Sequence, residues 1–195
     1  MAKIAVLERR TEACAEVLDL ADYRTARCAR LVHDGRDLMV EGREEEALDM
    51  TFEALRLDPD GYDALALAGT LLAILGDHNA SVVYTRRAIR NDPARADAYY
   101  ELGSTLLELG RAGEAFDWLE DGIARLGDRT DDLVDFMFSA KIEALVELGR
   151  FPEARATLST GRERSQDALQ LLSNAEEFLE SRRRAPLLRV VDGRR

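Results

Sequence analysis

Four short phrases recur along the chain at nearly constant spacing, each with a glycine, several polar residues and then a small residue. The glycines are Gly42, Gly76, Gly110 and Gly149, which lie 34, 34 and 39 residues apart. A fixed period of about 34 residues is typical of stacked helix-turn-helix repeats. Glycine adopts the left-handed conformation that ends a helix without a Cβ penalty. The spacing therefore predicts an all-α chain in which each glycine is the turn between two helices.

The residues on either side of each turn form stripes with helical spacing. Before the turns, leucines and glycines such as Leu65, Gly69 and Leu72 recur every three or four residues, which gives a helix one apolar face. The second helices should stop before Pro59 and Pro93, because proline removes a helix hydrogen bond and clashes with the preceding turn. After the turns, small residues seven positions apart predict a narrow packing seam: Ala47 and Ala54, Ser81 and Ala88, Ala115 and Gly122, Ala154 and Gly161.

These features resemble the tetratricopeptide repeat (TPR), whose pattern combines Leu-Gly, a turn glycine, two alanines, an aromatic residue and a closing proline. The stretches "YDALALAGTLLAILGD" and "ADAYYELGSTLLELGRAGEAFDWL" match it, and the resemblance covers residues 28–161. Thr51 and Thr85 stand where an aromatic residue is usual, Ser81 replaces an alanine, and Lys141 and Ile142 replace Leu-Gly in the fourth copy. The resemblance implies a right-handed TPR superhelix of antiparallel helix pairs, which is an α-α solenoid.

The repeat register divides the chain into a central array with two ends. TPR-like repeats are expected at residues 28–61, 62–95 and 96–129, with an irregular fourth at 135–161 whose first helix is longer. Because a terminal repeat lacks a neighbour over its apolar face, we expect capping helices at both ends. An N-terminal cap at 1–27 should contain a helix over 3–19 and a second one starting at Asp22. A C-terminal cap at 162–184, with Ser165 as its N-cap, precedes a basic tail at 185–195.

The charge of the chain is unevenly distributed. The net charge is −11, whereas residues 182–195 contain six arginines and one aspartate, or +5, which leaves −16 for residues 1–181. An acidic body argues against nucleic-acid partners, because phosphates require a basic face. It favours cationic or apolar protein partners, and the basic tail could contact an acidic surface, including its own.

The sequence also indicates a cellular setting. No apolar run approaches the roughly 20 residues that cross a bilayer, and the N-terminus becomes charged too early for a signal peptide. We therefore expect a cytoplasmic protein with no membrane insertion. Cys14 and Cys28 have no partner at metal-binding spacing, which predicts buried thiols. Arginine outnumbers lysine 25 to 2, which hints at a GC-rich, bacterial genome.

Motifs that carry catalysis are missing from the sequence. There is no phosphate-binding loop, zinc-protease motif or nucleophile elbow, so we expect neither an enzyme nor a cofactor or metal. His33 and His78 fall at helix-surface and turn positions, where solvation explains them. The carboxylates of residues 44–46 belong to a first helical turn, where they suit the helix dipole. Of Phe116 and Trp118, one is expected to pack between repeats and the other near the convex surface.

In TPR proteins, the first helix of each repeat lines a concave face that binds extended or helical peptides. In this chain, positions outside the packing stripe predict the residues of that groove: Val32, Arg36, Met39, Ala66, Thr70, Ala73, Tyr100, Ser104, Leu107, Ser139, Glu143 and Val146. The set is largely apolar and contains a single cation, which disfavours a clamp for a C-terminal carboxylate. An apolar segment held by pockets and a few hydrogen bonds is the expected ligand. Tyr100 and Leu107 have the alternative of packing against neighbouring helices.

The resemblance and the residues together favour a non-catalytic adaptor or scaffold that binds a partner peptide in its concave groove. One alternative is a bacterial secretion-type chaperone, since the chain is also similar to class II chaperones of type III secretion, which are small acidic TPR proteins that hold apolar client segments. The other alternative is a self-assembling scaffold, such as a homodimer, in which an uncovered helix face packs against a second copy.

Overall fold

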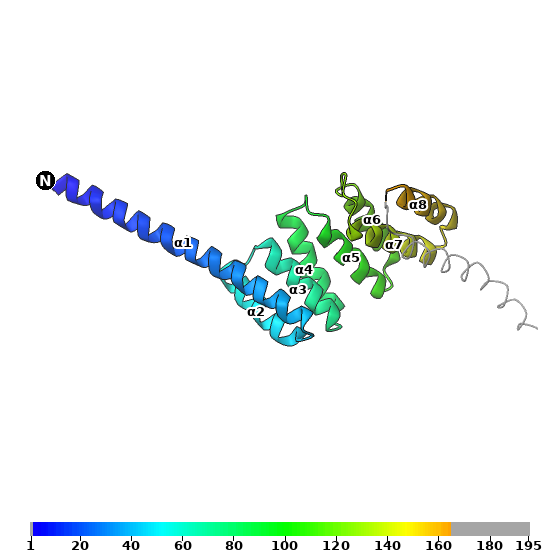
Figure 1. Ribbon diagram of the computed structural model, residues 1–195, viewed down its shortest axis with the longest axis horizontal. Helices are drawn as coiled ribbons and strands as arrows, with labels where there is room; N and C mark the ends of the chain where they lie inside the picture. The colour runs from blue at the N-terminus through cyan, green and yellow to red at the C-terminus, as the bar shows by residue number, and fades with distance from the viewer. Residues whose placement is uncertain (1, 165–195) are drawn as a thin grey trace, which may run out of the picture.

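The computed structural model describes residues 2–164, with side chains described from residue 20 onward. These residues form eight α-helices and no strand, arranged as an all-α solenoid of antiparallel helix pairs (Figure 1). The predicted fold class is therefore confirmed. The helices are α1 (Ala2–Val40), α2 (Glu44–Leu57), α3 (Tyr62–Ile74), α4 (His78–Asn91), α5 (Asp97–Glu108), α6 (Ala112–Ile123), α7 (Asp132–Glu147) and α8 (Phe151–Arg164).

The four turn glycines end the first helix of each pair as the sequence predicts. Gly42, Gly76, Gly110 and Gly149 have φ between 68° and 84°, a conformation that residues with a Cβ rarely adopt. The second helices α2 and α4 end two residues before Pro59 and Pro93 respectively. The turns within the helix pairs and the ends of α2 and α4 therefore lie where the glycines and prolines indicate.

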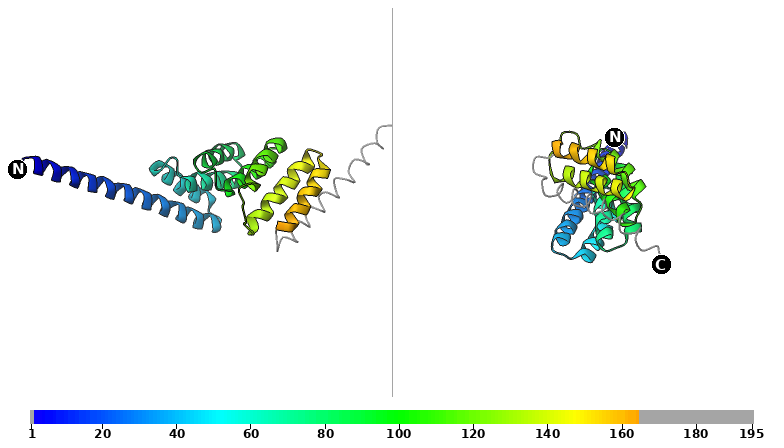
Figure 2. Two further views of the ribbon diagram at one scale, coloured as in Figure 1. Left: turned by 90° about the horizontal axis from the view of Figure 1, so that it is seen from above. Right: turned by 90° about the vertical axis from the view of Figure 1, so that its right-hand side faces the viewer.

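The N-terminal region differs from the prediction. A single 39-residue helix, α1, runs through Asp22 without a break, where two helices were expected. Its N-terminal half projects beyond the stack and does not fold across it as a cap (Figures 1 and 2). The physical reason is local: no proline or glycine precedes Gly35, so nothing interrupts helical hydrogen bonding.

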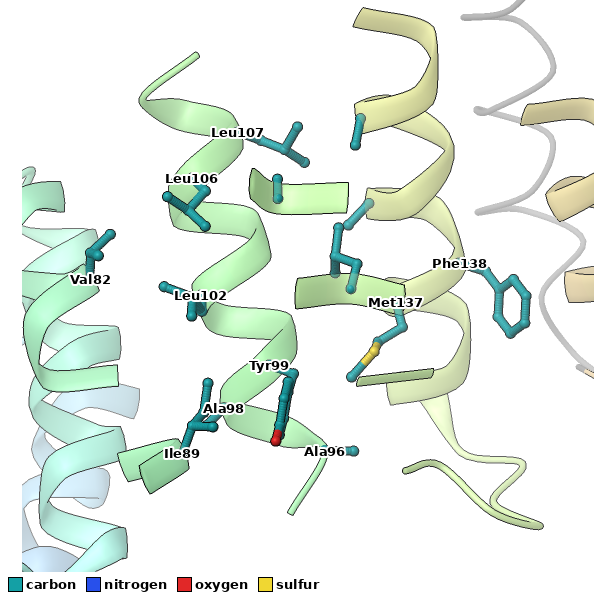
Figure 3. Packing of buried hydrophobic residues seen from close by; sticks show 14 of the residues in the cluster. Val82, Ile89, Ala96, Ala98, Tyr99, Leu102, Leu106, Leu107, Met137 and Phe138 are labelled. Atoms are coloured by element: carbon teal, nitrogen blue, oxygen red, sulfur yellow. The ribbon is translucent and has the colours of Figure 1, made fainter. Parts of the chain in front are cut away.

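The interior of the stack consists of three clusters of buried side chains, the largest of which joins α3 to α7. Leu102 and Leu106 of α5 point towards the preceding pair, whereas Met137 of α7 points back towards α5 (Figure 3). The predicted seam of small residues is buried in all four second helices. At Gly122 an added Cβ would lie 2.7 Å from both Tyr99 Cβ and Met137 Cε, so the seam allows the helices to approach closely.

The first helix of the last pair is longer than the first helices of the two central pairs, as expected for an irregular repeat. Its first helix, α7, has 16 residues, against 13 in α3 and 12 in α5. It begins at Asp132, three residues before the predicted start of the fourth repeat. Only the first residues of the predicted C-terminal cap at 162–184 are described, within α8. The remainder of the cap, Ser165 included, and the basic tail at 185–195 lie outside the described residues.

Candidate functional site

The first helices of successive pairs form the inner face of the solenoid. Contacts join α1 to α3, α3 to α5 and α5 to α7, whereas within the described residues no second helix contacts the second helix of the next pair. The first helices are therefore closer together, which is the geometry of a concave face. We call the exposed surface of α1, α3, α5 and α7 on this face the groove.

The structure brings four of the predicted groove residues together around one pocket. This pocket, which we call the α3 pocket, has a volume of about 370 Å³ and lies between α1, α3 and α5. Arg36 and Met39 line it from α1, and Ala66 and Thr70 line it from α3. The remaining wall includes Val40, Leu67, Asp97, Ala98 and Glu101, with Thr85 of α4 behind them. Apolar and charged groups therefore share a single concave site.

Val32 belongs to a neighbouring pocket of about 560 Å³ between α1 and the start of α3. Val32 itself is buried, whereas Arg36, which lines both pockets, is exposed. The larger pocket also contains Cys28, whose half-buried thiol lies 3.7 Å from the Ala54 carbonyl oxygen. Burial raises the pKa of this thiol above its usual value, with smaller contributions from Asp58 and Asp63. The described cysteine is therefore a poor nucleophile.

A network of ion pairs occupies the rim between the two pockets. Asp63 Oδ1 accepts hydrogen bonds from Arg36 (3.1 Å) and Arg95 (3.0 Å). Asp97 accepts from Arg95 (3.1 Å) and from the Tyr62 hydroxyl (2.9 Å). Burial opposes the charge on Asp63, but the two guanidinium groups outweigh it and lower the pKa of that carboxyl. Arg36, the single cation among the predicted groove residues, is therefore already paired within the protein.

Glu101 differs from these carboxylates because no basic side chain among the described residues pairs with it. It is half-buried on the α3 pocket wall, where Thr70 is within hydrogen-bonding reach. Burial raises the pKa of Glu101 above its usual value, and the negative charge of Asp97 adds to that effect, while the neighbouring Thr70 hydroxyl opposes it. The pocket therefore holds one carboxylate whose charge is not compensated by the rest of the described protein.

Thr85 supplies a second uncompensated polar group. Its side chain is fully buried behind the pocket, and its Oγ1 has no hydrogen-bond partner in the described part of the chain. The equivalent Thr51, one repeat earlier, donates to the Ala47 carbonyl oxygen at 2.7 Å. A buried hydroxyl without a partner is energetically costly, so the packing behind the pocket contains a polar group that the described protein does not satisfy.

The second half of the groove, between α5 and α7, is more completely filled. Leu107 and Val146 are buried, so Leu107 takes the packed alternative and neither residue lines an open surface. Tyr100 is half-buried, with its ring centroid 5.7 Å from that of Phe136. Glu143 is exposed. Three other predicted residues, Ala73, Ser104 and Ser139, are half-buried.

Several charged and aromatic groove residues escaped the sequence prediction. Asp63, Asp97 and Phe136 each lie three positions before a predicted groove residue, so extending the same stripe by one helical turn would have found them. Glu101 does not belong to this stripe, because it directly follows Tyr100 and lies on the side of α5 that faces α3. Only the packing of neighbouring repeats places it in the pocket.

The other side chains singled out from the sequence have structural placements. His33 is exposed, whereas His78 is the first residue of α4 and is half-buried rather than fully solvated. Phe116 and Trp118 are both half-buried; Trp118 packs against Tyr99 at a centroid separation of 5.9 Å. Within residues 20–164 no three potential metal ligands gather at one point. None of the described helices is both long and apolar enough to span a bilayer.

Comparisons with known proteins agree with this architecture. Residues 83–128 match the family model of the tetratricopeptide repeat. No curated protein matches the sequence. The solved structure of the MamA protein is similar with a TM-score of 0.64 and 21% identity, covering 80% of this chain and 86% of MamA. YrrB, described as a TPR protein with an unusual peptide-binding site, has a TM-score of 0.57 and 20% identity, covering 78% of this chain and 77% of YrrB.

A mutant O-GlcNAc transferase from Thermobaculum terrenum is also similar, with a TM-score of 0.62 and 22% identity over 72% of this chain. The chain spans only 26% of that transferase. The resemblance to class II secretion chaperones finds no support among these similarities. At these identities the likeness shows the fold alone: the chain is an all-α helical-repeat protein with the fold of TPR proteins, and its residues 83–128 match the TPR family.

Proposed function

We propose that this protein is a non-catalytic adaptor or scaffold in the cytoplasm that binds a peptide segment of a partner protein in its concave groove. The α3 pocket is the observation that carries the proposal. It combines apolar walls from Met39 and Ala66 with the uncompensated Glu101 and the hydroxyl of Thr70. Mostly apolar pockets with a few convergent polar groups are typical of ligand sites.

The predicted groove residues differ in the roles that their burial allows. Arg36, Met39, Ala66 and Thr70 would contact the ligand first, because they surround the open pocket. Leu107 and Val146 would support the groove from beneath, since both are buried. The remaining set, which is half-buried or exposed, would extend the contact along α3, α5 and α7: Ala73, Tyr100, Ser104, Ser139 and Glu143.

A pair of matched threonine substitutions tests the proposal. Thr70 donates to the Ala66 carbonyl oxygen at 3.2 Å within α3, and the exposed Thr160 makes the same bond to Ala156 at 3.1 Å within α8. Thr70→Leu fills the α3 pocket, whereas Thr160→Leu changes a threonine of the same kind away from it. Affinity capture with both variants and with the wild type, followed by quantitative mass spectrometry, measures the partners of each.

The expected result is a partner that binds the wild type and Thr160→Leu but is reduced at least about tenfold with Thr70→Leu, a loss of about 1.4 kcal/mol in binding free energy. Circular dichroism establishes that each variant keeps its helices. Equal recovery of every partner by both variants would show that the α3 pocket is not the binding site.

Self-assembly is a second candidate function, which the projecting half of α1 favours. Leu20 and Tyr23 of this helix are 61% and 60% exposed. Apolar side chains on a helix outside the stack could be covered by a second copy. Sedimentation velocity over a hundredfold range of concentration, on the wild type and on Leu20→Glu with Tyr23→Glu, tests this candidate. A mass that rises with concentration only in the wild type would support it, and a constant monomeric mass would eliminate it.

A further inference from the structure

We propose that the α3 pocket binds an arginine side chain, and that its first occupant is the chain's own basic segment, residues 182–195, folded back onto the groove of the same molecule. This inference rests on the proposed function, because it names the ligand chemistry of the same groove. The segment has the sequence "RRRAPLLRVVDGRR", in which arginines flank two pairs of aliphatic residues.

Charge complementarity selects a cationic ligand. The two arginines at the pocket rim, Arg36 and Arg95, are held by Asp63 and Asp97. Glu101 is left without a cation, and it lies on the pocket wall beside Thr70. A guanidinium group that entered the pocket would supply the missing positive charge, and partial exclusion of water would strengthen the attraction.

The charge on the rest of the groove also favours a cationic ligand. Glu108, Glu143 and Glu147 lie towards the C-terminal ends of α5 and α7, and no basic partner is found for any of them in the described residues. Burial raises the pKa of Glu143, and Glu147 and Glu108 raise it further, so these carboxylates repel one another. A segment with several arginines would relieve this repulsion along the groove.

The hydrogen-bonding and apolar groups of the pocket also suit arginine. Thr70 lines the pocket beside Glu101, and its hydroxyl oxygen can accept a hydrogen bond from a guanidinium group, which carries five N–H donors. Met39 and Ala66 offer an apolar surface for the methylene stem of the arginine. The leucines and valines of the basic segment could pack on Val40 of the pocket wall, which is 85% exposed.

The basic segment can reach the pocket within one molecule. Arg164, at the end of α8, donates to the Gly127 carbonyl oxygen, so the chain leaves α8 beside the loop that precedes α7. The 17 residues between Arg164 and Arg182 could span up to about 56 Å when extended. Neighbouring helix axes are about 8–10 Å apart, so the few helices between α8 and α3 lie within this reach.

The test measures competition between the attached segment and the same segment added as a free peptide. The probe is a fluorescein-labelled synthetic peptide with the sequence of residues 182–195, titrated into the full chain by fluorescence anisotropy. The tail variant is the full chain with Arg182→Glu, Arg183→Glu and Arg184→Glu. Because an occupied groove lowers the apparent affinity by the fraction that remains free, the tail variant should bind the probe at least about tenfold more tightly than the wild type.

Substitutions of groove and control carboxylates then locate the bound peptide. In the tail-variant background, Glu101→Gln should weaken probe binding at least about tenfold. Asp49→Asn removes an exposed carboxylate from α2, which is a second helix, and should change the affinity less than twofold. Glutamine and asparagine keep the shapes of the side chains, so circular dichroism should show unchanged helices in both variants.

Other outcomes would overturn the inference in distinguishable ways. Equal probe affinity for the wild type and the tail variant, with dependence on Glu101, would show that the groove accepts the peptide but is not occupied by its own segment; the proposed function would stand. Failure of the probe to bind either protein would overturn the arginine assignment and leave partner capture by the Thr70→Leu comparison as the separate test of the groove. A wild-type mass that rises with concentration and becomes constant in the tail variant would assign the occupant to a second copy.

Discussion

The first two helix pairs and the third pair pack the same position with different side chains. In the first half, Thr51 and Thr85 occupy the site opposite the glycine of the first helix, whereas in the third pair Leu119 occupies it. A Cβ on Gly69 would lie 2.2 Å from Thr85 Oγ1, and a Cβ on Gly103 would lie 2.5 Å from Leu119 Cγ. Both halves are tightly packed at this point, but only the leucine adds a large apolar side chain.

This difference changes how much apolar surface is buried, and which polar groups are buried, along the solenoid. Leu119 is fully buried in the central cluster, which extends from α3 to α7. Thr85 is buried as well, yet its hydroxyl has no described partner and lies behind the α3 pocket. The comparison teaches that the second pair keeps a polar side chain at a position where the third pair buries a leucine, so the third pair gains apolar burial there that the second pair lacks.

The largest expected effect comes from replacing the leucine of the third pair with the threonine found at this position in the first two pairs. Leu119→Thr should lower the free energy of unfolding by about 3 kcal/mol, because it removes buried methyl groups and leaves a buried hydroxyl. Urea unfolding followed by circular dichroism measures it. Leu148→Thr, at a leucine that is 41% exposed, is the control and should change stability by less than about 0.5 kcal/mol. A loss below about 1 kcal/mol in Leu119→Thr would remove the energetic basis of the comparison.

A smaller effect on the free energy of unfolding distinguishes the two threonines of the first two pairs. Thr85→Val removes an unpartnered hydroxyl and should raise the free energy of unfolding by about 1 kcal/mol. Thr51→Val removes the hydrogen bond to the Ala47 carbonyl oxygen and should lower it by about 1 kcal/mol. The same urea titration measures both variants. Changes of the same sign would mean that the Thr85 hydroxyl has a hydrogen-bond partner in solution.

The smallest expected effects are electrostatic, and their pH dependence has opposite sign in the two halves. Arg95 and Arg36 lower the pKa of Asp63, so its contribution to stability is present above the unfolded carboxylate pKa and is lost as pH falls through the folded pKa. Burial raises the pKa of Glu143, so the protonated form is favoured in the folded state, and stability is lost as pH rises through that raised pKa.

Two neutral variants measure these electrostatic contributions. Asp63→Asn should be less stable than the wild type at pH 7, and Glu143→Gln should be more stable, each by less than about 1 kcal/mol because both carboxylates are solvent-exposed. The Glu143 difference should vanish below about pH 3, where this carboxyl group is protonated. The Asp63 difference should shrink as the pH falls but persist until the pH has passed through the lowered pKa of Asp63. Thermal unfolding from pH 3 to pH 7 checks the signs, and a destabilising Glu143→Gln at neutral pH would contradict the account.

The sequence predicted most of the fold because its signals are local. The turn glycines and the prolines after the second helices each act through the backbone of their own residue, so spacing alone located the helix pairs. The prediction that a second helix begins at Asp22 was wrong, because the local signal at this residue was read alone. A residue that can cap a helix does not end the preceding one when helix-forming residues continue on both sides.

The groove was harder to predict than the fold, because its residues depend on contacts between repeats. The three-four spacing identified Met39 and Thr70, which line the pocket, but also Leu107 and Val146, which are buried. Helical periodicity gives the direction of a side chain and not the distance to the next helix. Glu101 is in the pocket because α5 packs beside α3, which no pattern within α5 could indicate.

The most direct test of the central claim, that the α3 pocket is where the peptide binds, is a methionine methyl NMR titration. The full-length tail variant would be labelled at the methionine methyl groups and titrated with the peptide of residues 182–195. Met39 lines the pocket, whereas Met50 lies in α2 and Met137 is buried against α6, so two internal controls are present. The account predicts a saturable shift of the Met39 resonance with little change at Met50 and Met137. A shift confined to Met50 or Met137, or no shift at all, would contradict it.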